Sequence, residues 1–203
     1  MGTRVQPEEP LLPHPHPADD FFLRPLPTIA SSGPWYRLYS TIYEPLFFSR
    51  KGSGRFDGPE QGYGMLYVGE DEYCAFIETF GRKHGARGVE EAALSRRGLA
   101  RIESSQPLRL ANLLGDGLVK LGADARLASG PYLMSRLWAQ AIWEHPTQVD
   151  GIRYRSRHDD TRICCGLFDR SADKFTRVGV SNLLLDCPHL LAEILAHYDY
   201  GLL

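Results

Sequence analysis

The sequence predicts an α+β fold in a single domain, with mixed or antiparallel sheets flanked by helices. The chain has 203 residues, of which 43% are hydrophobic and 24% charged, as expected for a globular protein with one core. Segments with strand alternation and segments with helical periodicity follow one another without a regular βαβ repeat. Two short strands near residue 160 flank a tight turn, which is typical of an antiparallel pair.

Composition excludes several classes of function. The net charge of −2 argues against direct nucleic-acid binding, which usually requires a basic excess. No apolar run approaches the roughly 20 residues that span a membrane, and no signal peptide is visible, so we expect a cytoplasmic location. The four cysteines have no metal-binding spacing and the seven histidines are scattered, so no metal site is expected.

Residues 1–33 are rich in proline and have no apolar period. Proline fixes φ and removes a backbone donor, so we expect a flexible arm here, with docking on the folded body as the alternative. The folded domain is expected over residues 34–203.

The first expected strand covers residues 35–40 and carries Arg37 among aromatic residues. Alternation places Tyr36 and Leu38 on one face and Arg37 and Tyr39 on the other. An arginine in such a strand is either paired inside the protein or extended along an edge. Structural and functional roles of Arg37 both stay open on this basis.

Residues 54–82 are the stretch around which the chain is organised. A glycine-rich turn with Arg55 precedes a short apolar strand at 65–68, which contains Tyr67. A helix capped by Asp71 is expected to follow, with its apolar residues spaced for one buried stripe.

Glu78 lies off the apolar stripe of this helix. Because Arg82 follows four residues later, the simplest interpretation is an ion pair on a solvated helix face. The alternative is a carboxylate presented to a site by a strand–helix unit.

The middle of the chain is expected to contain a helical surface insertion over 89–103 and a strand over 107–113. A short helix follows between glycines, then a turn at 127–130. Pro131 is well placed at the start of a helix that runs to about residue 145.

Residues 151–157 alternate strictly, with Ile152, Tyr154 and Ser156 on one face. Ser156 is therefore expected to point inward, as a core hydroxyl or towards a pocket. The arginines at 153, 155 and 157 share the other face, which is either solvated or an anion-binding rim. Strands at 161–168 and 177–180 follow, and Pro188 begins a last amphipathic helix.

No nucleotide-binding glycine loop follows a strand, and no Walker loop or G-x-S-x-G elbow is present. The ordered set of GRF with Arg55, LYV with Tyr67, Glu78 in the next helix and Ser156 in GIRYRSR resembles the RES domain family. The resemblance extends from about residue 35 to the C-terminus.

This resemblance implies an ADP-ribosyltransferase-like fold and an enzyme that consumes NAD as its substrate, with phosphate as a further substrate in a phosphorylase and with no cofactor. It also implies the toxin of a toxin–antitoxin pair, with a helix-turn-helix type antitoxin as partner. It implies roles for Arg55, Tyr67, Glu78 and Ser156. We expect Glu78, Arg55 and Ser156 to be catalytic, and Arg37, Tyr67 and Tyr154 to bind NAD, since arginine suits a pyrophosphate and a tyrosine ring offers a face for stacking.

Three functions stay open from the sequence. The first is cleavage of the nicotinamide–ribose bond by a phosphorylase or glycohydrolase, and the second is transfer of ADP-ribose to a protein. The third is a non-catalytic binding module. Whether the protein forms a homo-oligomer is also open.

Overall fold

The structure, a computed structural model, describes residues 14–82 and 87–203. An eight-stranded sheet with the order β1-β6-β7-β8-β3-β2-β5-β9 forms its centre. β6 and β7 run parallel, whereas the other neighbouring strands of this sheet are antiparallel. The strands of this sheet are β1 Thr28–Ser31, β2 Trp35–Ser40, β3 Met65–Gly69, β5 Arg97–Ser104, β6 Leu108–Leu113, β7 Gly151–Arg155, β8 Ile163–Phe168 and β9 Phe175–Ser181.

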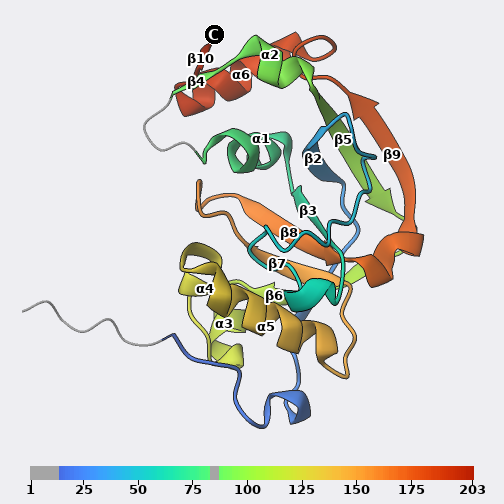
Figure 1. The fold of residues 1–203 in the computed structure, drawn as a ribbon, viewed down its shortest axis with the longest axis vertical. Helices are drawn as coiled ribbons and strands as arrows, with labels where there is room; N and C mark the ends of the chain where they lie inside the picture. Colours follow the sequence, from blue (N-terminus) through green and yellow to red (C-terminus); the bar gives the residue numbers. More distant parts are fainter. Residues whose placement is uncertain (1–13, 83–86) are drawn as a thin grey trace, which may run out of the picture.

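The helices cover the sheet in two groups (Figure 1). α3, α4 and α5 lie beside the β6–β7 end, and α2 and α6 lie at the opposite end, with α1 between the two groups. A small parallel pair, β4 Gly88–Val89 and β10 Gly201–Leu202, lies next to α6. The helices are α1 Glu72–Phe80, α2 Glu91–Ser95, α3 Asp116–Leu121, α4 Arg126–Ser129, α5 Tyr132–Glu144 and α6 Pro188–Tyr198, with short 3-10 turns at Phe21–Leu23, Pro59–Gln61 and Asp169–Lys174.

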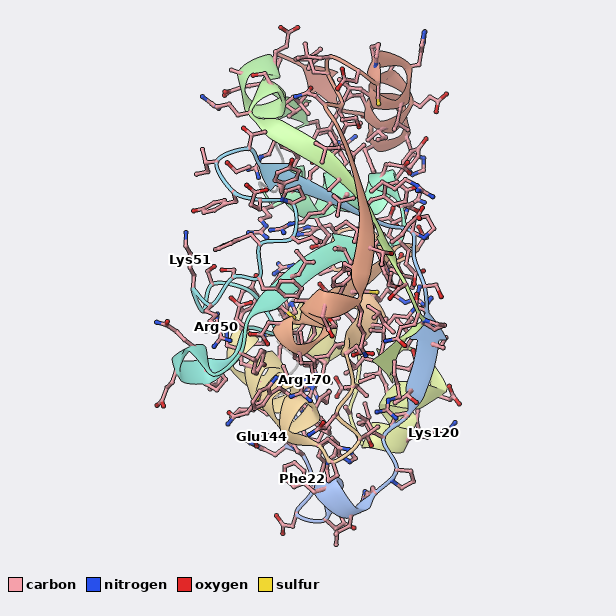
Figure 2. The ribbon with its side chains drawn as sticks, turned by 90° about the vertical axis from the view of Figure 1, so that its right-hand side faces the viewer. Phe22, Arg50, Lys51, Lys120, Glu144 and Arg170 are labelled. Carbon is pink, nitrogen blue, oxygen red and sulfur yellow. The ribbon has the colours of Figure 1, made fainter. Side chains whose placement is uncertain are left out.

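The curled sheet buries apolar side chains on both faces, in three core clusters. Cys164 belongs to the cluster around Trp138, and the adjacent Cys165 belongs to the cluster around Trp35. The two adjacent cysteines of this strand therefore point to opposite faces of the sheet. Arg170 ties the turn before β9 to α5, with its guanidinium 4.6 Å from the Trp143 ring (Figure 2).

β2 and β3 are neighbours in the sheet, but they pair only at Tyr36 and Gly69. The two strands therefore diverge beyond this point, and α1 packs over the opening. Gly69 permits this close packing, because a Cβ atom there would lie 2.6 Å from the Cβ of Cys74. Asp71 caps the helix as expected, accepting a hydrogen bond from the Cys74 amide at 2.7 Å.

The expected helical insertion over 89–103 is wrong. This stretch contains β4, the short α2 and then β5, which pairs with β2 on one side and β9 on the other. Ala100 and Ile102 are fully buried, whereas Arg101 between them is exposed. The charged residues of this stretch suggested a surface helix. The strand is instead fixed by pairing with segments far away in the sequence, which local patterns do not reveal. The turn expected at 127–130 is largely the single-turn helix α4.

The flexible arm expected over residues 1–33 is also wrong for residues 14–31; residues 1–13 lie outside the described part. β1 pairs with β6, and Phe21 packs edge-to-face on Trp138 with 5.5 Å between ring centroids. Trp138 Nε1 donates to the Pro15 carbonyl at 2.9 Å. Single buried side chains and backbone hydrogen bonds hold this segment, although its sequence has no apolar periodicity. The alternative of docking on the folded body therefore describes residues 14–31.

A chain starting at Ser32 is therefore expected to unfold at a lower temperature than one starting at His14. The truncation removes the buried side chains of Phe21 and Leu26, which contribute about 1.5–3 kcal/mol each, and uncovers the edge of β6. Thermal unfolding of the two chains tests this, because the His14 start keeps every contact described. Equal melting temperatures would show that the segment only rests on the domain.

Within residues 14–82 and 87–203, no helix has both the length and the apolar character needed to cross a membrane.

Candidate active site

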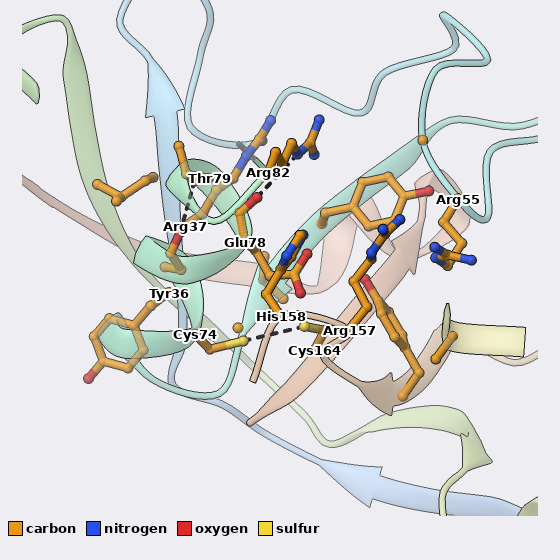
Figure 3. A pocket seen from close by; sticks show the side chains of 18 of the residues that line it. Tyr36, Arg37, Arg55, Cys74, Glu78, Thr79, Arg82, Arg157, His158 and Cys164 are labelled. Atoms are coloured by element: carbon orange, nitrogen blue, oxygen red, sulfur yellow. Dashed lines mark hydrogen bonds between the residues drawn. The ribbon is translucent and has the colours of Figure 1, made fainter. Parts of the chain in front are cut away.

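A cavity of about 430 Å³ opens where β2 and β3 diverge beneath α1. Its walls come from both halves of the chain, as Figure 3 shows. The lining residues are Tyr36, Arg37, Leu38, Gly54, Arg55, Tyr67, Val68, Gly69, Cys74, Ala75, Glu78, Thr79, Arg82, Arg97, Ala128, Tyr132, Tyr154, Arg157, His158 and Cys164.

Glu78 is the single carboxylate among these lining residues, and Ser156 holds it. The Ser156 hydroxyl donates to Glu78 Oε1 at 2.6 Å. Ser156 Oγ also accepts from the amides of His158 and Asp159, at 3.1 and 3.2 Å, which fixes the direction of its proton. Ser156 therefore holds one oxygen of the Glu78 carboxylate at the wall of the cavity.

The simple interpretation of Glu78 as half of a surface ion pair is not what the structure shows. Arg82 Nε reaches the backbone carbonyl of Glu78, at 3.3 Å, rather than its carboxylate. Cys74, Glu78 and Arg82 follow one another at intervals of four and all line the cavity. Residues four apart lie on the same face of a helix, so the sequence could have indicated that Cys74 and Arg82 lie beside Glu78.

Arg55 is almost fully buried, with 6% of its surface exposed. Its Nη1 donates to the Gly130 carbonyl at 2.6 Å and to Ser135 Oγ at 3.3 Å, and its guanidinium lies 4.6 Å from the Tyr132 ring. Burial lowers the pKa of Arg55, as does the nearby Arg157. Its Nη2 is buried without a hydrogen-bond partner among the described residues, which is costly unless a ligand accepts from it.

Arg37 also lines the cavity, and backbone carbonyls hold it. Its Nη1 donates to Pro45 O at 2.8 Å and to Phe47 O at 3.3 Å. Burial lowers the pKa of the Arg37 guanidinium to about 10, which leaves it charged at neutral pH. Arginine is the commonest charged residue of the lining: Arg37, Arg55, Arg82, Arg97 and Arg157. The cavity is therefore suited to an anionic ligand that also meets one carboxylate.

The arginine stripe expected at 153, 155 and 157 is divided by the end of β7. Arg153 pairs with Glu70, Nε to Oε1 at 2.6 Å, and Arg155 is exposed and donates to the Asp160 carbonyl. Of the three, only Arg157, two residues beyond the end of the strand, lines the cavity. The neighbouring His158 was not anticipated, because the path of the loop places it there rather than any alternation.

Tyr67 and Tyr154 both line the cavity, as expected of ligand-binding residues. Tyr154 packs edge-to-face on Phe56, with 4.7 Å between ring centroids. The Tyr67 hydroxyl, by contrast, is already engaged: it donates to Asp57 Oδ1 and accepts from the Phe56 amide, both at 2.8 Å.

The thiols of Cys74 and Cys164 meet at the floor of the cavity, with 3.3 Å between their sulfur atoms. The hydrogen bond with Cys74, together with burial, raises the pKa of the Cys164 thiol well above its usual value. Cys164 is therefore held as a thiol, a poor nucleophile.

Among the residues that the structure describes, no group of three or more His, Cys, Asp or Glu is placed to hold a metal ion.

The geometry unites Arg55, Glu78 and Ser156 from three distant segments, and residues 34–188 match the sequence model of the RES domain. The chain belongs to the RES domain family. A curated relative, "Probable toxin y4kH" of Sinorhizobium fredii, is 36% identical over 123 residues, which are 58% of this chain and 94% of that protein.

The RES domain fold is also found in a solved structure. The chain is similar, with a TM-score of 0.64 and 15% identity, to a protein in the crystal structure of the M. tuberculosis MbcT–MbcA toxin–antitoxin complex. The match covers 83% of this chain and 92% of that one. The expected family and the ADP-ribosyltransferase-like α+β fold are thereby confirmed.

All residues expected to form the RES domain site lie together. Arg37, Arg55, Tyr67, Glu78 and Tyr154 line the cavity, and Ser156 reaches it through its hydrogen bond to Glu78. Their chemical roles stay predictions.

Proposed function

We propose that this RES domain protein consumes NAD by cleaving its nicotinamide–ribose bond, as a phosphorylase or a glycohydrolase. The observation that carries the proposal is the Glu78 carboxylate, fixed by Ser156 in a cavity that five arginines also line. When the C1′–N bond breaks, its electron pair goes to the nicotinamide nitrogen and positive charge develops on the ribose. An oriented carboxylate stabilises such an oxocarbenium-like centre.

The charge of the cavity fits the rest of this substrate. NAD carries a pyrophosphate, and arginine forks bind phosphate oxygens through charge-assisted hydrogen bonds. Arg55 has a buried donor, Nη2, without a partner among the described residues, and a phosphate oxygen would satisfy it. The surplus of arginines also favours an anionic acceptor, such as inorganic phosphate, over a neutral one.

Product analysis tests the proposal. The purified protein is incubated with NAD in the presence and absence of inorganic phosphate, and the products are separated and identified by mass. Phosphorolysis yields nicotinamide and phosphorylated ADP-ribose only with phosphate, whereas hydrolysis yields ADP-ribose in both samples. Modified protein as the main product would indicate an ADP-ribosyltransferase instead. No release of nicotinamide under any condition would overturn the proposal.

We further propose that the protein is a toxin controlled by an antitoxin that covers this cavity. The proposal is supported by the relative described as a toxin and by the toxin–antitoxin complex that contains the similar fold. A helix-turn-helix type antitoxin, as the family resemblance implies, would be encoded beside the gene. Induced expression should lower cellular NAD and stop growth, and co-expression of the neighbouring product should restore both. Normal growth at a high level of the folded protein would contradict the toxin role.

Ser156→Ala is expected to lower kcat for NAD cleavage roughly tenfold or more, because Glu78 loses the hydrogen bond that orients it. Steady-state kinetics measures the effect. Ser171→Ala is the matched control, since Ser171 is equally buried but bonds to the Phe168 carbonyl outside the cavity. Equal rates for both variants would mean that the serine only supports the loop after β7.

A further inference from the structure

We propose that Asp57 and the hydroxyl of Tyr67 act as positioning residues, forming a clamp that aims Arg55 at the anionic part of the substrate. This inference rests on the proposed function in that the substrate is taken to be NAD. It assigns a role to Asp57, which the sequence did not single out. It also gives Tyr67 a task other than contact between its ring and the ligand.

The clamp holds the backbone on both sides of Arg55. Asp57 is 2% exposed, and its Oδ2 accepts from the Gly54 amide at 2.7 Å. Its Oδ1 accepts from the Tyr67 hydroxyl at 2.8 Å. The hydroxyl oxygen of Tyr67 in turn accepts from the Phe56 amide, also at 2.8 Å. The two amides that flank Arg55 are thus fixed through one carboxylate and one phenol.

The loop lies against the clamp without spare room. A Cβ atom on Gly54 would come within 2.4 Å of Asp57 Oδ1 and 2.5 Å of the Tyr67 hydroxyl. Arg136 of α5 also donates to the carbonyls of Gly52 and Gly54, with Nη2 at 2.5 and 3.0 Å. The clamp therefore holds the amides of the backbone that carries Arg55, and Arg136 holds its carbonyls.

The protonation of the clamp agrees with this geometry. Burial, and then the Asp57 carboxylate, raise the pKa of Tyr67 well above its ordinary value. The phenol therefore keeps its proton and remains the donor to Asp57 at every physiological pH.

The position of Arg55 must be fixed because the two terminal nitrogens of its guanidinium have different roles. Nη1 is bound to the protein at Gly130 and Ser135, and Nη2 is left for a ligand. A shift of the loop would disturb the bonds of Nη1 to the protein and the contact of Nη2 with the ligand together. Misplacement of a binding group by about 1 Å can lower a reaction rate a hundredfold. The clamp preserves this geometry without itself touching the anion.

Tyr67→Phe separates the clamp from a stacking role, because it keeps the ring and removes only the hydroxyl. Titration calorimetry measures the dissociation constant of NAD in the Glu78→Gln background, where turnover does not interfere. Tyr67→Phe and Asp57→Asn are each expected to weaken NAD binding roughly tenfold. In proteins that also carry Arg55→Ala, neither change should weaken binding further.

Tyr63→Phe is the matched control. Its hydroxyl is also buried and donates to the Phe56 carbonyl at 3.0 Å, but it leaves the amides of Gly54 and Phe56 paired. It should have little effect on the dissociation constant, even where the melting temperature falls as in Tyr67→Phe. Wild-type affinity in Tyr67→Phe, or equal losses with and without Arg55, would overturn the clamp.

Inorganic pyrophosphate serves as a second probe that separates this inference from the proposed function. If the parent protein binds pyrophosphate but not NAD, and Tyr67→Phe weakens pyrophosphate binding, the NAD proposal fails and the clamp stands. If NAD binds the parent and the Tyr67→Phe protein equally, the clamp fails and the proposed function stands. Binding of neither probe to the parent protein would overturn both.

Discussion

Replacing Glu78 with glutamine is expected to lower the rate of NAD cleavage by at least about a hundredfold, the usual effect of losing one group that stabilises transition-state charge. Glutamine has nearly the same shape, and its carbonyl oxygen can still accept from Ser156. What disappears is the negative charge beside the ribose. The fold should persist, because the buried stripe of α1 is formed by residues such as Phe76 and Ile77.

Glu72→Gln is the control for this change, since Glu72 belongs to the first turn of the same helix and is absent from the cavity lining. Release of nicotinamide from NAD and the far-ultraviolet circular dichroism spectrum are measured for both variants. A folded Glu78→Gln protein that works at the wild-type rate would remove the carboxylate from the mechanism.

Arg55→Lys is expected to raise KM for NAD by roughly tenfold to a hundredfold, the range of one or two charge-assisted hydrogen bonds. A lysine ammonium is a point charge and cannot reproduce the fork that reaches Gly130, Ser135 and a ligand together. The value of kcat should change less, because the lost contact is made with the bound substrate as well as with the transition state.

Arg50→Lys tests whether any arginine of this loop region has the same effect. Arg50 lies on the surface, where it pairs with Asp169 away from the cavity (Figure 2). Steady-state kinetics of the two variants, with melting temperatures to confirm folding, decides the matter. An unchanged KM in Arg55→Lys would mean that Arg55 holds its loop and binds no substrate.

The elements with strong local patterns were predictable from the sequence. Spacing and capping predicted three of them: the helix that Asp71 caps, the strand with Ile152 and Tyr154, and the last helix, which starts at Pro188. Strand β5 was not predictable, because charged residues surround its buried Ala100 and Ile102 and its place depends on strands far away in the chain.

The candidate site was predictable as a set of residues but not as a geometry. Alternation indicated that Ser156 points inward, yet it contains no sign of the hydrogen bond to Glu78, which joins residues 78 positions apart. Arg157 was expected to share a face with Arg153 and Arg155. It instead reaches the cavity because β7 ends at Arg155 and the alternation ends with it.

The divergence of β2 from β3 has a consequence for how the protein acquires activity. The side chains at that opening are brought together by contacts between residues far apart in the sequence: 78 positions for Glu78 and Ser156, and 80 for Arg55 and Ser135. Such contacts form late in folding, because the entropy of closing long loops must be offset before they contribute. A chain with its helices formed but its sheet unpaired thus lacks the proposed active site. Activity and native tertiary structure should be lost together along a denaturant titration.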